Sequence, residues 1–240
     1  MQFGAKPLFE NVSVKFGDGN RYGLIGANGC GKSTLLRYLA GLQEPTSGEV
    51  LVNGKPWDSN NNTSMVFQKY SSLPWLTVLD NVALGLKFKG VAKKERLEKA
   101  MEMIQLVGLD GHERKYAQYP NLSGGQLQRV AIARSLLVNP DILLMDEPFG
   151  ALDIKIRLDM QNLLAELWRK FELTIIFVTH DISEAVYLGD EIFIMSTSPA
   201  QIIERVPISL SLNRSREIKR DREFVDLVYD IEDKMMKIDT

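Results

Sequence analysis

A glycine-rich segment at residues 26–33, Gly-Ala-Asn-Gly-Cys-Gly-Lys-Ser, constrains the fold of this chain more than any other feature. It follows a short apolar stretch at 22–25 and precedes a stretch with helical spacing at 33–42. Between a strand and a helix, the pattern G-x-x-x-x-G-K-[ST] is typical of a loop whose backbone N–H groups surround phosphate oxygens. In such a loop Lys32 supplies the cation, and the Ser33 hydroxyl can bind Mg²⁺. The residues expected to contact phosphates are Gly26, Asn28, Gly29, Cys30, Gly31, Lys32, Ser33 and Thr34.

The rest of the chain alternates between apolar strands and helices. Strands are predicted at 22–25, 48–52, 65–67, 142–145, 174–178 and 192–195, and helices at 33–42, 93–107, 125–138, 154–170 and from 183. Residues 8–16 alternate loosely between apolar and polar and lead into a hairpin-like turn at 17–20. Apolar strands that alternate with helices indicate an α/β fold with a parallel sheet covered on both faces.

Composition excludes several classes of protein. The 29 Lys and Arg residues nearly balance the 31 Asp and Glu residues, and the net charge of −2 gives no overall field for nucleic acid. The single cysteine cannot form an internal disulfide, which suits a reducing compartment. No apolar run approaches the ~20 residues that would span a bilayer, and the N-terminus lacks a signal-peptide pattern. We therefore expect a cytoplasmic chain that can still dock on a membrane protein.

Two carboxylates follow the apolar strand at 142–145. Asp146 is expected at the sheet edge beside the phosphate loop, where it would hold Mg²⁺ mostly through water. Glu147 is one residue further and could polarise a water near the terminal phosphate. The alternative is that both are solvated carboxylates at the end of a strand.

The segment Leu-Ser-Gly-Gly-Gln at 122–126 decides the family. It resembles the signature motif of ATP-binding cassette (ABC) ATPases, and Gln68, Asp153 and His180 stand in the order that this family shows. The resemblance covers nearly the whole chain. It implies a P-loop NTPase (RecA-like) core with a small N-terminal antiparallel β part and a helical insert. The implied nucleotide-binding domain is 1–212, with its core at 1–70 and 140–212 and its insert at about 71–139, followed by a charged helical tail at 213–240.

The resemblance also implies a role for each motif. Each ATP would lie between the phosphate loop of one protomer and the signature of its partner, Ser123, Gly125 and Gln126. A serine and glycines at a helix N-terminus have the N–H groups for such an anion site. Gln68 would contact Mg²⁺ and the attacking water, Glu147 would be the base, and Asp153 would couple the two sites. His180 would contact the γ-phosphate, and Lys32 belongs to the catalytic set as well. Phe3 is the candidate for stacking on adenine, and His112, the other histidine, is interpreted as solvated.

Two functions remain open at this point. The segments 73–78, 128–134, 149–153 and 186–190 resemble the ATPases of nitrate, sulfonate and taurine importers. Such a subunit would be a homodimer, peripheral on the inner face of the cell membrane, with permease subunits and a solute-binding protein as partners. The opening segments at 3–9 and 20–29 resemble ABC-F proteins instead, so the alternative is a soluble, ribosome-associated ATPase.

The segment 73–76 and the charged tail at 213–240 can each be interpreted in two ways. Residues 73–76, Leu-Pro-Trp-Leu, are expected in the groove that receives the permease, with Trp75 as the anchor; the alternative is packing within the insert. Apolar residues recur at helical spacing in the charged tail, which predicts a surface helix that packs on the core. The alternative is a regulatory or partner-binding tail. These apolar residues are Phe224, Leu227, Val228, Ile231 and Met235.

Overall fold

The computed structural model describes residues 7–52, 54–58, 62–69, 71–197, 199–211 and 214–238. The chain divides into two compact units, one of residues 1–61 and 167–240 and one of residues 62–166. The phosphate loop lies in the first unit and the signature segment in the second. Phe3 lies outside the described residues.

The first unit is built on β1 (Arg21–Gly26), β6 (Thr174–Val178), β7 (Glu191–Met195) and β8 (Ile202–Pro207). β1 is parallel to both β6 and β7, and β8 runs antiparallel to β7. All six residues of β1 are buried because strands flank it on both sides. The predicted parallel arrangement of continuous apolar strands is confirmed here.

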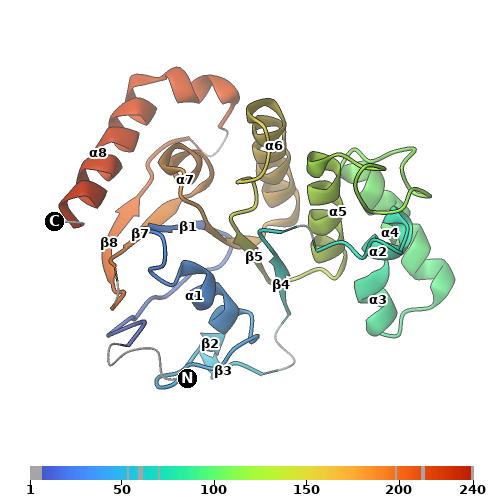
Figure 1. Ribbon diagram of the computed structural model, residues 1–240, viewed down its shortest axis with the longest axis horizontal. Helices are drawn as coiled ribbons and strands as arrows, with labels where there is room; N and C mark the ends of the chain where they lie inside the picture. Colours follow the sequence, from blue (N-terminus) through green and yellow to red (C-terminus); the bar gives the residue numbers. More distant parts are fainter. Residues whose placement is uncertain are drawn as a thin grey trace. The chain divides into compact units, whose positions relative to one another are not determined.

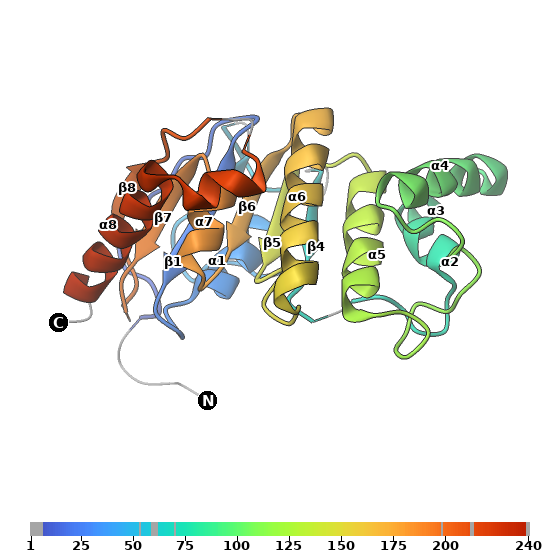
Figure 2. The same cartoon turned by 90° about the horizontal axis from the view of Figure 1, so that it is seen from above.

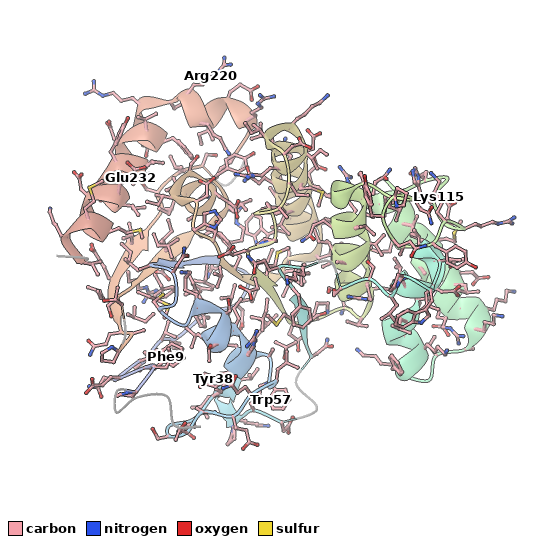
Figure 3. All side chains as sticks on the ribbon, in the orientation of Figure 1. Phe9, Tyr38, Trp57, Lys115, Arg220 and Glu232 are labelled. Carbon is pink, nitrogen blue, oxygen red and sulfur yellow. The ribbon has the colours of Figure 1, made fainter. Side chains whose placement is uncertain are left out.

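Two helices cover opposite sides of these strands. α1 (Lys32–Leu39) packs against β1 and β6, and α7 (Ile182–Leu188) packs against β1 from the other side (Figures 1 and 2). α1 is shorter than the predicted 33–42, because Gly41 has φ +66 and a helix cannot continue through that conformation. The ring of Trp57 lies against Gly41 at this point (Figure 3).

The tail forms a short 3₁₀ helix, η1 (Arg216–Arg220), and then α8 (Arg222–Ile238), which packs on α7 (Figure 1). Phe224 and Ile231 are buried in the stripe that the sequence predicted. Lys234 joins the helix to β8 through an ion pair of 2.8 Å with Glu204. The prediction of a surface helix that buries an apolar stripe is confirmed.

The second unit contains the parallel pair β4 (Thr63–Val66) and β5 (Ile142–Asp146) and a helical part. In the helical part, α5 (Gly124–Leu137) packs against α2 (Val78–Val82), α3 (Leu84–Phe88) and α4 (Lys93–Leu106), as Figure 2 shows. α6 (Ile154–Phe171) begins in this unit, and its residues from 167 onward belong to the first unit.

Several elements differ from the prediction. Residues 8–16 form an isolated bridge between Phe9 and Ala200 instead of a strand, and the small antiparallel pair is β2 (Leu51–Val52) with β3 (Lys55–Pro56). The sequence did not predict α2, α3 or β8. Within the described part of the chain, none of the helices has the length and apolarity that crossing a bilayer requires.

Candidate nucleotide site

The phosphate loop connects the buried strand β1 to α1. Gly26 ends the strand with φ +156, and Gly31 precedes the helix with φ +94. A Cβ atom on Gly26 would lie 2.6 Å from the carbonyl oxygen of Met195 on the neighbouring strand. Both positions therefore require glycine, because a side chain would meet either a forbidden conformation or a backbone atom. The loop has the tight, inward-turned path that the motif predicts.

Lys32 lies inside the curve of this loop. Its Nζ donates hydrogen bonds to the carbonyl oxygens of Gly26 and Ala27, at 2.7 and 2.9 Å, and the side chain is buried. The Nζ is also 3.7 Å from Cys30 Sγ. The cation thus sits beside the first N–H groups of α1, whose N-cap, Gly31, has no side chain to satisfy them. A fixed cation at a helix N-terminus, where the first N–H groups have no partner within the helix, fits a phosphate group.

An aromatic side chain of the N-terminal segment packs on the loop and pairs with a ring of α1. A Cβ atom on Gly31 would lie 2.6 Å from Cζ of Phe9, so the ring rests directly on this glycine. Phe9 in turn meets Tyr38 of α1 edge-on, with ring centroids 5.9 Å apart (Figure 3). The sequence analysis did not single out Phe9, because its ring is one of several apolar side chains in the alternating segment at 8–16.

His180 lies at the same sheet edge as the loop. Leu24 of β1 is in register with Val178 of β6, so the ends of both strands meet there. Thr179 is buried and donates its N–H to the carbonyl oxygen of Leu24 at 3.3 Å, which fixes the segment before His180. His180 itself is exposed. The structure therefore brings His180 and the phosphate loop to one edge, as parallel strands require.

The carboxylates of the second unit are not simply solvated. Asp146 ends β5 and is buried. Glu147 follows with φ +43 and accepts a hydrogen bond of 2.7 Å from Gln68 Nε2. The alternative of two solvated carboxylates at a strand end is therefore wrong for Asp146, whereas Glu147 is half-buried. The structure brings Gln68 and Glu147 together although 79 residues separate them in the chain.

The signature segment begins α5. Ser123 is the N-cap: its Oγ accepts from the N–H of Gln126 at 3.3 Å, and its own N–H donates to Gln126 Oε1 at 2.9 Å. This reciprocal pair is a capping box. Leu122 is buried, whereas Ser123 is exposed. The buried Leu122 therefore anchors the segment, and Ser123, at the start of α5, lies at the surface.

Gly125 and Asp153 connect α5 to the start of α6. A Cβ atom on Gly125 would overlap Ile156 of α6, so the two helices touch at this glycine. Asp153 accepts a hydrogen bond of 3.0 Å from the N–H of Ile156, as a helix N-cap does. Both residues thus have a local structural role at the positions where the sequence suggested nucleotide contacts.

The segment 73–76 leaves Trp75 exposed, at 68% of its full area. The backbone of this segment is held by Asn81, which is fully buried in α2. Its Oδ1 accepts from the N–H of Leu73 at 2.8 Å, and its Nδ2 donates to the carbonyl oxygen of Leu73 at 3.0 Å. Trp75 is therefore not part of a core within the described residues. Sequence reasoning missed Asn81, and the signal was a polar residue inside an apolar helical turn.

His112 is a correction to the sequence analysis. It is half-buried, and its Nε2 lies 2.9 Å from Nε2 of Gln126 in the signature segment. The interpretation of a solvated histidine is wrong, because a residue 14 positions away in the sequence contacts it.

A glycine loop that encloses a buried lysine at a strand–helix junction defines a P-loop nucleotide-binding protein. Comparison with known proteins gives the family. Residues 9–150 match the family model described as ABC transporter. The chain therefore belongs to the ABC transporter family, and it is an ATP-binding cassette with ATPase activity.

Individual relatives agree with this assignment. The chain is 46% identical over 208 residues to an ABC transporter ATP-binding protein of Methanocaldococcus jannaschii, covering 86% of this chain and 77% of that one. It is 41% identical over 229 residues to the taurine import ATP-binding protein TauB of Escherichia coli K12, covering 93% and 89%. These relatives are transporter subunits by name, and the ABC-F alternative is not favoured.

Solved structures confirm the fold. An ATP-binding cassette solved as a dimer in a post-hydrolysis state with ADP and Pi superposes with a TM-score of 0.76 at 31% identity, covering 88% of this chain and 96% of that one. CbiO1 from Clostridium perfringens, part of the cbiONQ transporter complex, also gives a TM-score of 0.76, at 25% identity, covering 94% and 92%. The predicted P-loop NTPase fold class is thus confirmed.

Proposed function

We propose that this chain is the ATP-hydrolysing subunit of an importer, which dimerises head-to-tail around two Mg-ATP and drives a permease for a small anion such as nitrate, a sulfonate or taurine. The observation that carries the proposal is the 41% identity to a taurine import ATP-binding protein over 93% of the chain. The nucleotide-binding domain is assigned to 1–212, with the helical insert at about 71–139 and the tail at 213–240.

The phosphate loop supports the nucleotide part of the proposal. Lys32 and the N–H groups at the start of α1 would hold the β- and γ-phosphates, and His180 stands at the same sheet edge. Gly26, Asn28, Gly29, Cys30, Gly31, Ser33 and Thr34 complete the loop contacts. Phe3 is assigned to adenine by resemblance alone.

The metal part of the proposal depends on oxygen ligands. Mg²⁺ prefers hydroxyl, amide and carboxylate oxygens, and Ser33, Gln68 and Asp146 offer one of each kind. Because Gln68 Nε2 is bonded to Glu147, its Oε1 is the atom that would bind the ion. When bound, Mg²⁺ would neutralise charge on the phosphates.

Glu147 is assigned as the general base. Its contact with Gln68 fixes the carboxylate in place, and a fixed carboxylate can accept a proton from an attacking water. The residue keeps this position in a left-handed backbone conformation, φ +43, which costs energy in any residue except glycine. Backbone strain of this kind is common at functional sites.

The signature supports the dimer. Ser123 is exposed at the N-terminus of α5 while the capping box holds the first turn in shape. With Gly125 and Gln126 it would close over the nucleotide of the other protomer, and Asp153, at the start of α6, would link the two sites. One chain has one phosphate loop, so this second phosphate-seeking surface is best used by a second copy.

The exposed Trp75 supports the membrane partner. An exposed indole is a suitable anchor for an interface when the backbone beside it is fixed, as the buried Asn81 fixes Leu73 and Leu76. We assign this segment to the permease, which places the subunit on the inner face of the cell membrane. The proposed importer would also include a solute-binding protein. Nucleic acid is not among the proposed partners.

A photo-crosslinking experiment tests the importer assignment. Trp75 is replaced by a photoreactive phenylalanine analogue, and the same replacement at Tyr229, 62% exposed on α8, is the matched control. The proposal expects a crosslink to an integral-membrane permease from position 75 and none from position 229. Crosslinks of equal yield at both positions, or crosslinks to ribosomal proteins only, would remove the importer assignment.

A further inference from the structure

A series of four hydrogen bonds runs from the loop after α4 into the signature helix, and the contact between His112 and Gln126 is the one that joins the two. His112 Nδ1 is 3.0 Å from the carbonyl oxygen of Asp110, and its Nε2 is 2.9 Å from Gln126 Nε2. The Oε1 of Gln126 accepts a hydrogen bond from the N–H of Ser123, and the backbone N–H of Gln126 donates to Ser123 Oγ. The loop that carries His112 also includes Lys115, which Figure 3 labels at the surface.

The donors and acceptors in this series of hydrogen bonds decide which ring nitrogen of His112 accepts and which one donates. The N–H of Ser123 can only donate, so the oxygen of the Gln126 amide must face it and the amide nitrogen must face His112. An amide nitrogen can only donate, so His112 Nε2 must accept. The carbonyl oxygen of Asp110 can only accept, so Nδ1 must carry the proton. The geometry thus corresponds to the tautomer in which Nδ1 donates to Asp110 and Nε2 accepts from Gln126.

We propose that His112 is a positioning residue for the signature segment, acting through the Gln126 side chain on the N-terminus of α5. The inference rests on the proposed function in one respect, since it assumes that this segment faces the nucleotide of the other protomer. With Nε2 as the acceptor, the ring holds the Gln126 amide in the one orientation that completes the capping box. A capping box stabilises the first helical turn, whose N–H groups are the ones offered to phosphate.

The same geometry predicts what another protonation state would do. A ring with a proton on Nε2 would place two donors face to face, so the Gln126 amide would have to rotate and withdraw its oxygen from Ser123. The charged side chains of the loop are Asp110, Glu113, Arg114 and Lys115, and α5 presents the uncharged Gln126 to the ring.

Two further contacts brace the loop. Hydrogen bonds from the backbone N–H groups of Glu113 and Gly111 lower the pKa of Glu113, so this carboxylate stays charged and bonded to the loop near neutral pH. Arg129, one turn further along α5, donates to the carbonyl oxygen of Val107 at 2.6 Å. The loop is thus tied to α5 at two points, of which the His112 contact is the one that reaches the signature.

Nitrogen NMR of the full chain labelled with ¹⁵N-histidine tests the inference directly, because the protein has only two histidines. The spectrum of a His112→Gln variant assigns the signals. At pH 7 we expect the His112 ring to carry its proton on Nδ1 only. A Gln126→Glu variant should convert the ring mostly to the doubly protonated form, since a carboxylate oxygen would then face Nε2. Gln105→Glu, which adds the same charge on an exposed position of α4, should leave the ring unchanged.

Activity measurements supply the second readout. His112→Ala should lower the rate of ATP hydrolysis about 3- to 10-fold, the effect of one neutral hydrogen bond, and mainly in kcat. His112→Gln should restore most of the rate, because its Oε1 can accept from the Gln126 amide. A proton on Nε2 in the wild-type protein, or a ring indifferent to Gln126→Glu, overturns the inference. Absence of ATP hydrolysis in the wild type would instead overturn the proposed function, and the NMR result would still decide the role of His112.

Discussion

Gln68 Nε2 donates a hydrogen bond of 2.7 Å to Glu147 Oε2, which joins the segment after β4 to the segment after β5. The two strands are parallel and in register, with Val66 opposite Met145, so both residues emerge from the same sheet edge. The contact holds the proposed base and a proposed metal ligand together within one unit of the protein.

Replacing the proposed base should abolish turnover without disturbing this contact. Glu147→Gln keeps an oxygen that can accept from Gln68, but it removes the group that takes a proton from water. We expect the rate of ATP hydrolysis to fall by roughly 10²–10⁴, the usual value of a positioned base, while ATP binding remains. Glu172→Gln is the matched control, because Glu172 is an exposed glutamate that also has a positive φ, +50. Hydrolysis by the Glu147 variant above a tenth of the wild-type rate would exclude Glu147 as the base.

The phosphate loop should tolerate no side chain at its first glycine. Gly26→Ala combines a glycine-only φ of +156 with a Cβ atom 2.6 Å from the Met195 carbonyl oxygen. We expect the free energy of unfolding to fall by roughly 2–4 kcal/mol. Gly48→Ala, at φ +82 with open space around the new Cβ among the described residues, should cost only about 1 kcal/mol. Equal costs in urea unfolding of the two variants would show that Gly26 is not packed against β7.

Asp190 stabilises the first unit by neutralising two buried arginines. Arg21 Nη2 lies 2.7 Å and Arg214 Nη2 3.4 Å from Asp190 Oδ1, and both guanidinium groups are almost fully buried. Burial, together with the neighbouring charge of Arg21, lowers the pKa of Arg214 to about 10. Arg214 also donates to the carbonyl oxygens of Val186, Tyr187 and Gly189 at the end of α7.

Asp190→Asn should therefore destabilise the protein far more than the loss of an ordinary ion pair. It leaves two buried cations without their counter-charge, a situation that costs about 3–5 kcal/mol. As the control, Glu95→Gln breaks the exposed pair with Lys99, which is 2.7 Å long and should be worth less than about 1 kcal/mol. Urea unfolding of both variants measures the difference, and similar losses would contradict the account of Asp190.

The single cysteine provides a chemical probe of the loop. Cys30 is buried, and its Sγ lies 3.7 Å from Lys32 Nζ. A maleimide should therefore react slowly, inactivate the protein once it has reacted, and react more slowly still when Mg-ATP is present. Mass spectrometry follows the labelling, with Cys30→Ser as the unlabelled control. Labelling at the same rate with and without nucleotide would count against the assignment of this loop.

The elements that the sequence predicts well are those whose pattern is local. β1, β5, β6 and β7 are continuous apolar runs, and α4 and α8 have long amphipathic repeats, so periodicity identifies them. α2 and α3 are missed because each has only five residues. β8 is missed because it is an antiparallel strand in which Val206 alone is fully buried, and its polar residues hide the strand pattern.

The candidate site divides in the same way. The phosphate loop is predictable because its glycines, lysine and flanking elements are adjacent in the chain. The contacts between Phe9 and Gly31, and between His112 and Gln126, are not, because they join segments that only the folded chain brings together. Phe9 stands in a loosely alternating segment and His112 in a polar loop, and neither pattern indicates the partner that the side chain meets in the fold.

Complementation between two inactive variants tests whether each ATP lies between Lys32 of one protomer and Ser123 of the other. Lys32→Ala removes the cation of the loop, and Ser123→Arg blocks the opposing surface by its bulk. In a mixed dimer, the intact loop of one variant meets the intact signature of the other and forms one complete site. Thermal unfolding of each variant first establishes that both are folded, since Ser123→Arg also removes an N-cap.

The deciding measurement is nucleotide-dependent dimerisation of the equimolar mixture, followed by light scattering, which requires binding alone and not turnover. We expect that neither variant dimerises by itself and that the mixture does so with Mg-ATP. If the wild type dimerises under the same conditions and the mixture remains monomeric, the head-to-tail arrangement of Lys32 and Ser123 is contradicted.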